Sequence, residues 1–407
     1  MTKDFIDKFS NSLCDVLDKD KSILIARDTR ASGIEIENWI KKIMIEKGFN
    51  LHLAQVLPTP GISNLLEEGD YSLGIMITAS HNPNTDNGIK LFGGNGYKLL
   101  SNIEQDIERK ILKNKFHSSV APNGEIKFLD NSFGQYINSV VDKEINLKQR
   151  ILVDCSNGAF SELSNFYRNK NIEYINNSPN GNNINLDCGA LHPEKLLNEM
   201  IIKDFDFGVA FDGDGDRSVF VSKEYGVIES EKLAVLLCED SDQDNNKVVS
   251  SEISNFALKK NLDSINGTLI ETPVGDRFVV ESSKKMGALF GFEPSGHFYF
   301  PDKSKSMDGF VALLKFIDLV SKYGVGINKK IKKLAHFDRV QENIDIKNFQ
   351  DKDISHLQKK LNSLITKDEK LIIRKSMWDP VIRVYYDYIK ENNFLNIKNE
   401  IHNFLGA

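Results

Sequence analysis

The chain has 407 residues, 40% of them hydrophobic, and a formal net charge of -6 at pH 7. At roughly 100–200 residues per domain, this length predicts two to four domains, each with enough apolar residues to bury a core. The negative charge argues against a general nucleic-acid-binding protein, because such proteins need many Lys and Arg contacts to phosphates. A small anionic ligand remains compatible with it.

The composition of the chain also bears on its compartment. Residues 1–8 are too charged for a signal peptide, and no apolar run is long enough to span a bilayer. The four cysteines lie far apart and form neither a Cys-x-x-Cys pair nor a disulfide framework. They are Cys14, Cys155, Cys188 and Cys238. We therefore expect reduced, mostly buried thiols, no membrane partner and a cytoplasmic location.

Short apolar runs alternate with polar loops and helical patterns in the first third of the chain. Ser22–Ala26 is apolar, and after the polar loop Arg27–Gly33 apolar residues recur at helical spacing as far as Met44. Two further strands are predicted at Leu51–Leu57 and Leu73–Ile77. Alternating strands and helices predict an α/β domain with a mostly parallel sheet, whose ligands bind beyond the carboxyl ends of the strands.

Charged and polar stretches divide the rest of the chain. A new strand begins at Ile151 after a charged stretch, and another begins at Val248 after the polar stretch Glu239–Lys247. The last segment has the pattern of a small strand-and-helix domain. The expected domains are residues 1–148, 149–240, 241–338 and 339–407.

A polar loop, Thr78–Pro83, directly follows the third predicted strand, so the hydroxyl of Ser80 is expected to project beyond the sheet rather than into the core. The turn Asp86-Asn87-Gly88 then leads into a predicted strand, Ile89–Phe92, with Lys90 on the face opposite its apolar neighbours. A serine in such a loop is either a nucleophile or a residue that satisfies the backbone of a turn. The loop alone supports both readings equally.

A second loop, Asp212–Arg217, follows the predicted strand Phe207–Phe211 and carries three carboxylates at alternate positions. These belong to Asp212, Asp214 and Asp216. Three close carboxylates repel one another without a cation, and oxygen ligands suit magnesium or calcium. An EF-hand would need Gly and Glu where this chain has Arg217 and Lys223. We therefore expect a metal site of a different kind.

Two later loops carry groups that suit a sugar phosphate. Glu293–His297 combines an acceptor, a hydroxyl and an imidazole near a small-residue turn. Arg374–Ser376, with Arg383 nearby, brings guanidinium groups and a hydroxyl together, as in a phosphate clamp. Taken singly, the first is more readily a structural turn, and the second is as readily a charged strand edge.

The order of these loops along the chain resembles the α-D-phosphohexomutase superfamily. The matching segments are Ile77–Pro83, Asp212–Arg217 and Glu293–His297, with shorter matches at Arg27–Gly33, Asp86–Lys90 and Val274–Arg277. Two groups of residues are most similar to the bacterial phosphoglucosamine mutases of that superfamily. They are Asn183–Asn185 with Cys188-Gly189 and His192–Glu194, and Arg374–Ser376 with Pro380 and Ile382–Val384. The resemblance implies three similar mixed-sheet α/β domains plus a smaller α+β C-terminal domain around a central cleft.

The resemblance also implies an activity, the interconversion of hexose 6-phosphate and hexose 1-phosphate through a phosphoserine at Ser80 and a 1,6-bisphosphate. Glucosamine phosphate is the expected substrate, and hexose 1,6-bisphosphate is the expected activator. One Mg²⁺ per chain would be held by Ser80, Asp212, Asp214 and Asp216. The implied catalytic residues are Ser80, His81, Lys90, Arg217 and His297. The implied substrate-binding residues are Glu293, Ser295, Gly296, Arg374, Ser376 and Arg383. We expect no nucleic-acid partner, and a monomer or homodimer.

The sequence departs from the family pattern at two places. The segment Lys3–Asp18 reads as the helix that follows the family's Gly-rich N-terminal loop, so that loop and its supporting arginine are expected to be missing. The phosphate loop has Met377, Trp378 and Asp379 where the family has Gly, Thr and Glu. Two alternatives therefore stay open: a phosphomannomutase or phosphoglucomutase, or a degenerate relative that binds sugar phosphates without efficient turnover.

Overall fold

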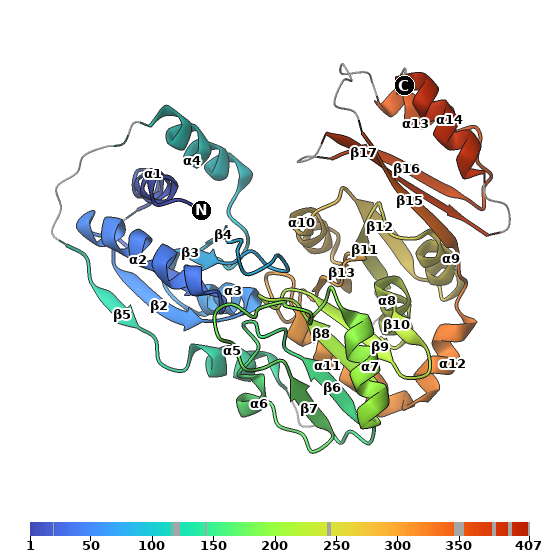
Figure 1. Ribbon diagram of the computed structural model, residues 1–407, viewed down its shortest axis with the longest axis horizontal. Helices are drawn as coiled ribbons and strands as arrows, with labels where there is room; N and C mark the ends of the chain where they lie inside the picture. The colour runs from blue at the N-terminus through green and yellow to red at the C-terminus, as the bar shows by residue number, and fades with distance from the viewer. Residues whose placement is uncertain are drawn as a thin grey trace.

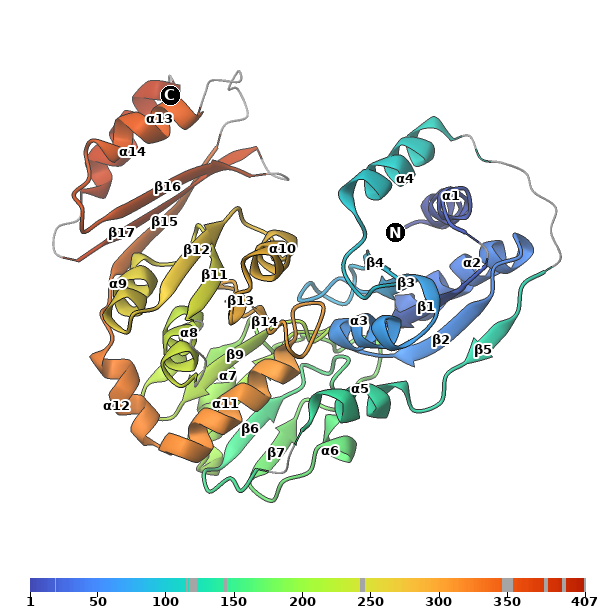
Figure 2. The same ribbon diagram turned by 180° about the vertical axis from the view of Figure 1, so that it is seen from behind.

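The computed structural model describes residues 1–18, 20–114, 116, 123–142, 145–241, 246–345, 354–376, 380–389 and 393–405. Its helices and strands form four units, called here units I to IV in chain order, each built on one sheet. The units follow one another along an arc, with units I and IV at its two ends in both views (Figures 1 and 2).

Unit I has a five-stranded sheet in the order β4-β3-β1-β2-β5. Its elements are α1 (Lys3–Cys14), β1 (Ser22–Arg27), α2 (Ala31–Glu46), β2 (Leu51–Val56), α3 (Thr59–Glu68), β3 (Tyr71–Ile77), β4 (Ile89–Gly93), α4 (Ser101–Lys113), β5 (Ile126–Phe128) and α5 (Ser132–Val140). Strand β1 pairs in parallel with β2 and β3, while the edge strand β4 is antiparallel to β3. The interior of β1 is buried on both faces, which is why its sequence is a continuous apolar run. The strands predicted in this region are confirmed.

Unit II has a mixed sheet in the order β10-β9-β8-β6-β7. Its elements are β6 (Ile151–Asp154), α6 (Leu163–Phe166), β7 (Ile172–Ile175), α7 (Pro193–Lys203), β8 (Phe207–Phe211), β9 (Ser218–Ser222) and β10 (Gly226–Ile228). Strand β8 is parallel to β6 and antiparallel to β9, so the loop Asp212–Arg217 is the connection of a β-hairpin. The loop therefore emerges at the carboxyl end of a fully buried strand.

Unit III has a sheet in the order β12-β11-β13-β14, and unit IV has an antiparallel sheet in the order β15-β17-β16. The elements after β10, as far as α12, are α8 (Ser230–Glu239), β11 (Lys247–Ser251), α9 (Phe256–Ser264), β12 (Thr268–Thr272), α10 (Asp276–Met286), β13 (Phe290–Phe292), β14 (Phe298–Tyr299), α11 (Gly309–Tyr323) and α12 (Gly326–Lys333). Those of unit IV are β15 (Asp338–Asp345), α13 (Ile354–Asn362), β16 (Lys370–Lys375), β17 (Val381–Tyr388) and α14 (Phe394–Leu405).

The four sheets bear out the predicted α/β class with several mixed sheets. Each expected domain range contains one sheet, apart from Asp338, the first residue of β15. The exact domain boundaries and the central cleft stay predictions. None of the helices in the described part of the chain is both long and apolar enough to cross a membrane.

Buried apolar side chains form one cluster that units I to III share and further clusters within single units. Units I, II and III contribute to one continuous cluster that includes Leu24 of β1 and Ile331 of α12. Unit IV has a core of its own, around Leu357, Ile382 and Ile397. Loops that emerge from units I to III are therefore carried on sheets that share a core, whereas unit IV carries its loops on a separately packed body.

Candidate active site

The Ser80 loop and the loop Asp212–Arg217 meet where units I and II adjoin. The hydroxyl of Ser80 donates to Oδ2 of Asp212 at 2.6 Å, and Nδ1 of His81 lies 3.3 Å from the same hydroxyl. Ser80 has a φ of 52°, in the left-handed region that is uncommon for residues other than glycine. Such conformations persist where the surroundings hold them, and they are often found at functional sites.

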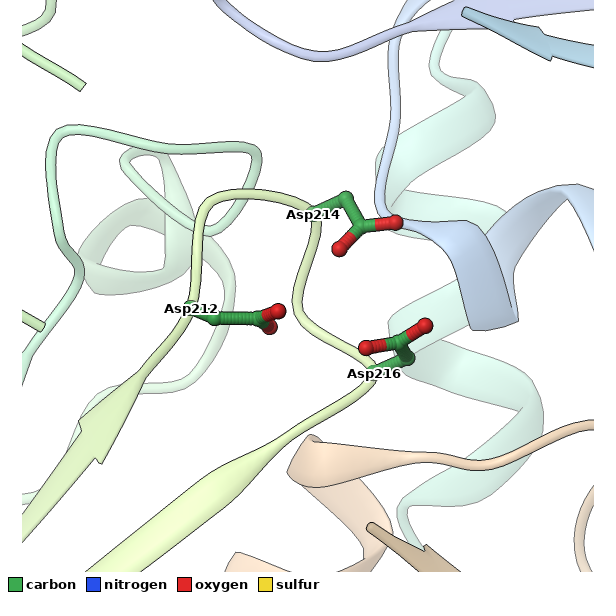
Figure 3. A group of neighbouring side chains, drawn as sticks. All are labelled: Asp212, Asp214 and Asp216. Atoms are coloured by element: carbon green, nitrogen blue, oxygen red, sulfur yellow. The ribbon is translucent and has the colours of Figure 1, made fainter. Parts of the chain in front are cut away.

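The three aspartates of the second loop form a buried cluster, with at most 3% of any of them exposed. One carboxylate oxygen from each lies within 4.8 Å of the others, along a single turn of chain (Figure 3). The buried Oδ1 of Asp214 has no hydrogen-bond partner in the described part of the chain. Burial, together with the charges of Asp216 and Asp214, raises the pKa of Asp212 to about 7.

These properties fit a hard divalent cation. Oxygen donors are the ligands that Mg²⁺ prefers, and a cation would neutralise buried carboxylates that otherwise repel one another. Asp212, Asp214 and Asp216 are the residues that would hold it. Ser80, which already contacts Asp212, is next to that site.

Lys90, on the edge strand β4, reaches the same cluster from unit I. Its ammonium donates to Oδ2 of Asp214 at 2.5 Å and to Oδ2 of Asp216 at 2.6 Å. Burial lowers the pKa of Lys90, but the two carboxylates outweigh it and the net result is a raised pKa. Lys90 is therefore held as a cation, and its charge offsets part of the negative charge of the aspartate cluster.

The loop Glu293–His297 joins β13 to β14 and lies against the strand that follows the aspartate cluster. The N–H of Ser218 donates to the carbonyl of Gly296 at 2.9 Å, and a Cβ on Gly296 would lie 2.7 Å from the Ser218 carbonyl. Gly296 also has a φ of 93°. Only glycine fits both the close approach and this backbone conformation.

His297 is the link between this loop and the aspartate cluster. Its Nε2 lies 3.0 Å from Nε of Arg217, which donates to it, and 3.2 Å from Oδ1 of Asp216. Its Nδ1 lies 2.9 Å from the Ser295 hydroxyl and 3.4 Å from Oε2 of Glu293.

The contacts of His297 favour opposite protonation states of its ring. Burial and the Arg217 guanidinium lower the pKa of His297, but Asp216 and Glu293 outweigh them and raise it to about 9. The hydrogen bond from Arg217, in contrast, requires an Nε2 without a proton. A cation bound at Asp216 would weaken the attraction that raises the pKa of His297 and would so favour the neutral ring. In the neutral ring Nε2 accepts the N–H of Arg217.

The remaining predicted residues are on unit IV and are not part of this cluster of loops. Arg374 of β16 and Arg383 of β17 are directly opposite each other, and the N–H of Ser376 donates to the Val381 carbonyl at 2.9 Å. Guanidinium groups are donors that suit a phosphate or a carboxylate. The altered residues of this loop, at positions 377–379, lie outside the described residues.

Comparison with known proteins places this geometry in a family. Residues 1–118 match the model for phosphoglucomutase/phosphomannomutase, alpha/beta/alpha domain I, and residues 229–337 match the model for domain III. The phosphoglucosamine mutase of Campylobacter curvus is 34% identical to the chain over 403 residues, which cover 94% of this chain and 89% of that protein. The chain belongs to the α-D-phosphohexomutase superfamily. The expected family is thus confirmed.

Solved structures of other phosphohexomutases share the fold. A phosphoglucomutase/phosphomannomutase family protein from Burkholderia thailandensis superposes with a TM-score of 0.82 at 20% identity, over 100% of this chain and 94% of that chain. The N-acetylphosphoglucosamine mutase of Aspergillus fumigatus, solved in complex with GlcNAc-6P and magnesium, gives a TM-score of 0.63 at 15% identity. That match covers 85% of this chain and 90% of the fungal chain.

In this phosphohexomutase, three further residues contact the site loops, and the sequence did not predict a role for any of them. Thr59 donates to Oδ2 of Asp214. Arg30 is fully buried, and its guanidinium donates to main-chain carbonyls of the Ser80 loop. Asn185 donates to two of the same carbonyls from unit II. Arg30 and Asn185 lie in segments that match the family, but a polar residue in a loop is usually exposed, so sequence alone gave neither a role.

Proposed function

We propose that this phosphohexomutase interconverts glucosamine 6-phosphate and glucosamine 1-phosphate by way of a phosphoryl group carried on Ser80. The observation that carries the proposal is the 2.6 Å contact between the Ser80 hydroxyl and Asp212. It puts a hydroxyl that can carry a phosphoryl group beside three buried carboxylates suited to a divalent cation. Glucosamine is favoured as the sugar because the curated relatives that match most of the chain are named phosphoglucosamine mutases.

In the proposed cycle, phosphorylated Ser80 gives its phosphoryl group to the free hydroxyl of a hexose monophosphate. The bond between Oγ and phosphorus breaks as a bond to the sugar oxygen forms, and the sugar hydroxyl loses its proton. The resulting 1,6-bisphosphate turns over in the site and returns its other phosphoryl group to Ser80. Bound Mg²⁺ would neutralise charge on the transferring group.

The residues around Ser80 supply the positioning and the proton transfers that such a cycle needs. In this proposal His297, which lies beside Arg217 and Asp216, would accept the proton of the sugar hydroxyl. Lys90, which lies beside Asp214 and Asp216, would donate a proton to the leaving oxygen. His81 and Arg217 lie beside the nucleophile and the aspartates. Their positions support the roles that the family resemblance implies.

Substrate recognition is proposed for two loops. Glu293 and Ser295 would bind sugar hydroxyls, with Gly296 allowing the loop to approach unit II. Arg374, Ser376 and Arg383 would bind the phosphate that does not react, since paired guanidinium groups suit a phosphate. Because these residues are on unit IV, the proposal requires unit IV and units I to III to contact one substrate molecule together.

The test is turnover by the purified protein with Mg²⁺ and a hexose 1,6-bisphosphate as activator. Glucosamine, glucose and mannose 6-phosphates are compared, and the highest kcat/KM is expected for glucosamine 6-phosphate. Intact-mass measurement should show one phosphoryl group that the Ser80→Ala variant lacks. A preference for glucose or mannose would contradict the proposed sugar. No turnover of any of the three would leave a sugar-phosphate-binding protein instead of an enzyme.

A further inference from the structure

Asn185 lies where three loops of the phosphohexomutase site come together. It belongs to the connection between β7 and α7 in unit II, but its side-chain amide reaches into unit I. There Nδ2 donates to the carbonyl of Ser80 at 2.9 Å and to the carbonyl of Asn82 at 3.2 Å. One side chain therefore holds the backbone at Ser80 and two residues after it.

A second donor shares both of these carbonyls. Nη2 of Arg30 donates to the Ser80 carbonyl at 2.9 Å and to the Asn82 carbonyl at 2.8 Å. A carbonyl oxygen has two lone pairs, so each of these oxygens has two partners and a fixed orientation. On the other side of the residue, the N–H of Ser80 donates to Oγ1 of Thr78 at 2.9 Å. The backbone is thus held both before and after the nucleophile.

These bonds explain how Ser80 keeps its unusual conformation. A non-glycine residue with a φ of 52° is unfavourable by itself and needs its surroundings to hold it. This conformation directs the hydroxyl of Ser80 to Asp212. If the carbonyl at 80 were released, the turn could relax and the hydroxyl would move away from the aspartate cluster.

The loop Asp212–Arg217 packs directly on the Asn185 amide and the Ser80 carbonyl. A Cβ built on Gly213 would lie 2.8 Å from Nδ2 of Asn185 and 2.7 Å from the Ser80 carbonyl. Gly213 stands between Asp212 and Asp214, so Asn185 touches the segment that carries the proposed metal ligands as well as the loop that carries the nucleophile. The distance between the nucleophile and the aspartates is therefore set partly through this amide.

We propose that Asn185 is a positioning residue for phosphoryl transfer, because its amide fixes the Ser80 loop against the aspartate loop across the boundary of units I and II. The inference rests on the proposed function, since it concerns the group that Ser80 carries. Asn185 is assigned no contact with the substrate. Its loss should therefore slow transfer more than it weakens binding.

The test compares Asn185→Ala and Asn185→Asp with the wild type and with Asn182→Ala, a control in the same loop whose side chain is exposed. Asp has nearly the same shape as Asn but cannot donate to the two carbonyls when it is ionised. Both Asn185 variants should lower kcat about 10–100-fold, because moving a reacting group by about 1 Å can lower the rate of the chemical step by up to about 100-fold. KM should stay within about twofold of the control. Tm should stay close to that of the control in Asn185→Asp, because Asp tolerates the φ of 56° at this position as Asn does, whereas Ala is strained there.

A second measurement needs no turnover. Amide hydrogen exchange of a peptide that spans the Ser80 loop should be at least about tenfold faster in both Asn185 variants than in Asn182→Ala, because local opening is easier when restraining hydrogen bonds are removed. Unchanged exchange would overturn the inference, even if the protein proved to have no mutase activity. An inactive wild type with altered exchange in the variants would contradict the proposed function alone.

The kinetic outcomes separate positioning from a general structural role. If the wild type is active and both variants keep the kcat of the control, the inference is wrong. It is also wrong if the loss of kcat comes with an equal rise in KM, or with a fall in the Tm of Asn185→Asp large enough to show that the fold has been weakened. A fall in kcat alone, together with faster exchange confined to the Ser80 loop, supports it.

Discussion

Replacing Asp214 with Asn should remove the response of the protein to Mg²⁺ while leaving the fold intact. The two side chains have the same shape, and Asp214 is fully buried. Oδ2 of Asp214 accepts hydrogen bonds from Lys90 and Thr59, whereas its buried Oδ1 has no partner in the described structure. The substitution removes one of three buried negative charges and one proposed metal ligand.

The size of the effect follows from binding linkage. A ligand that binds only the folded state at 100 times its Kd stabilises that state by about 2.7 kcal/mol. Loss of a partner that merely orients a ligand lowers metal affinity about 10–100-fold, so loss of a direct ligand should cost at least about 100-fold. At the same Mg²⁺ concentration the variant then keeps only about 0.4 kcal/mol. At about 2 °C per kcal/mol, Mg²⁺ should raise Tm by roughly 5 °C in the wild type and by about 1 °C in Asp214→Asn.

The assay is thermal unfolding with and without Mg²⁺, followed by turnover at saturating Mg²⁺. Asp187→Asn is the matched control, because its exposed carboxylate pairs with Lys195 on the surface of the same unit. Without Mg²⁺, Asp214→Asn relieves repulsion with Asp212 but also loses the charge that pairs with Lys90. The comparison therefore uses the Mg²⁺-induced shift in Tm of each protein and not their absolute Tm values. An equal Mg²⁺ shift in the variant and the wild type, or no shift in either, would refute the metal assignment.

Lys90→Met should lower kcat by roughly 10²–10⁴-fold, the usual contribution of a positioned proton donor, and a steady-state kcat within tenfold of the wild type would contradict that role. Arg374→Ala should raise KM for the hexose phosphate at least about tenfold, because hydrogen bonds from a charged group contribute about 1.5–3 kcal/mol. Arg109→Ala is its control, because the Arg109 side chain is exposed. Equal KM values for the two variants would exclude a phosphate clamp. Burial raises the pKa of Asp308 to about 6. The protonated side chain therefore contributes its full stabilisation of the folded state below about pH 4, and this contribution is lost as the pH rises through 6. The free energy of unfolding in urea should fall by about 3 kcal/mol between pH 4 and 7 in the wild type, and Asp308→Asn should abolish this decrease. An unchanged pH dependence in the variant would show that another group is responsible.

The attachment of unit IV bears on how the proposed clamp reaches the other loops. Arg339 of β15 pairs with Asp387 of β17 through Nε at 2.6 Å and Nη2 at 2.8 Å, and its Nη1 donates to the Ile253 carbonyl of unit III at 2.7 Å. Oδ2 of Asp387 also accepts from the N–H of Phe256 at 2.8 Å. A separately packed core joined by directional polar contacts has a defined orientation and can still move as a body. The substrate binding proposed between unit IV and the other units would therefore not require either core to repack.

The sequence predicted the strands that carry the site because they obey short-range rules. Ser22–Ala26, Leu73–Ile77 and Phe207–Phe211 are apolar runs bounded by polar loops, and each is a buried strand with at least one parallel neighbour in the structure. The spacing of the three aspartates predicted that their carboxylates would lie close together, and in the structure one oxygen of each lies within 4.8 Å of the others. That they hold a cation stays a prediction. Ser80, in turn, could be expected at a carboxyl strand end, where ligands of α/β domains bind.

Tertiary structure alone decided which of these loops touch. Ser80 and Asp212 are 132 positions apart, and Lys90 and Asp214 are 124 apart, so their contacts depend on how separate sheets pack and not on any local pattern. The same packing buries Arg30, which the sequence offered only as a polar loop residue, and makes it a donor to the Ser80 loop. Periodicity and spacing act over a few residues, whereas burial and long-range hydrogen bonds arise only when whole units meet. For this reason the clustering of the three aspartates could be predicted from the sequence. The hydrogen-bond network that holds Ser80 beside them could not.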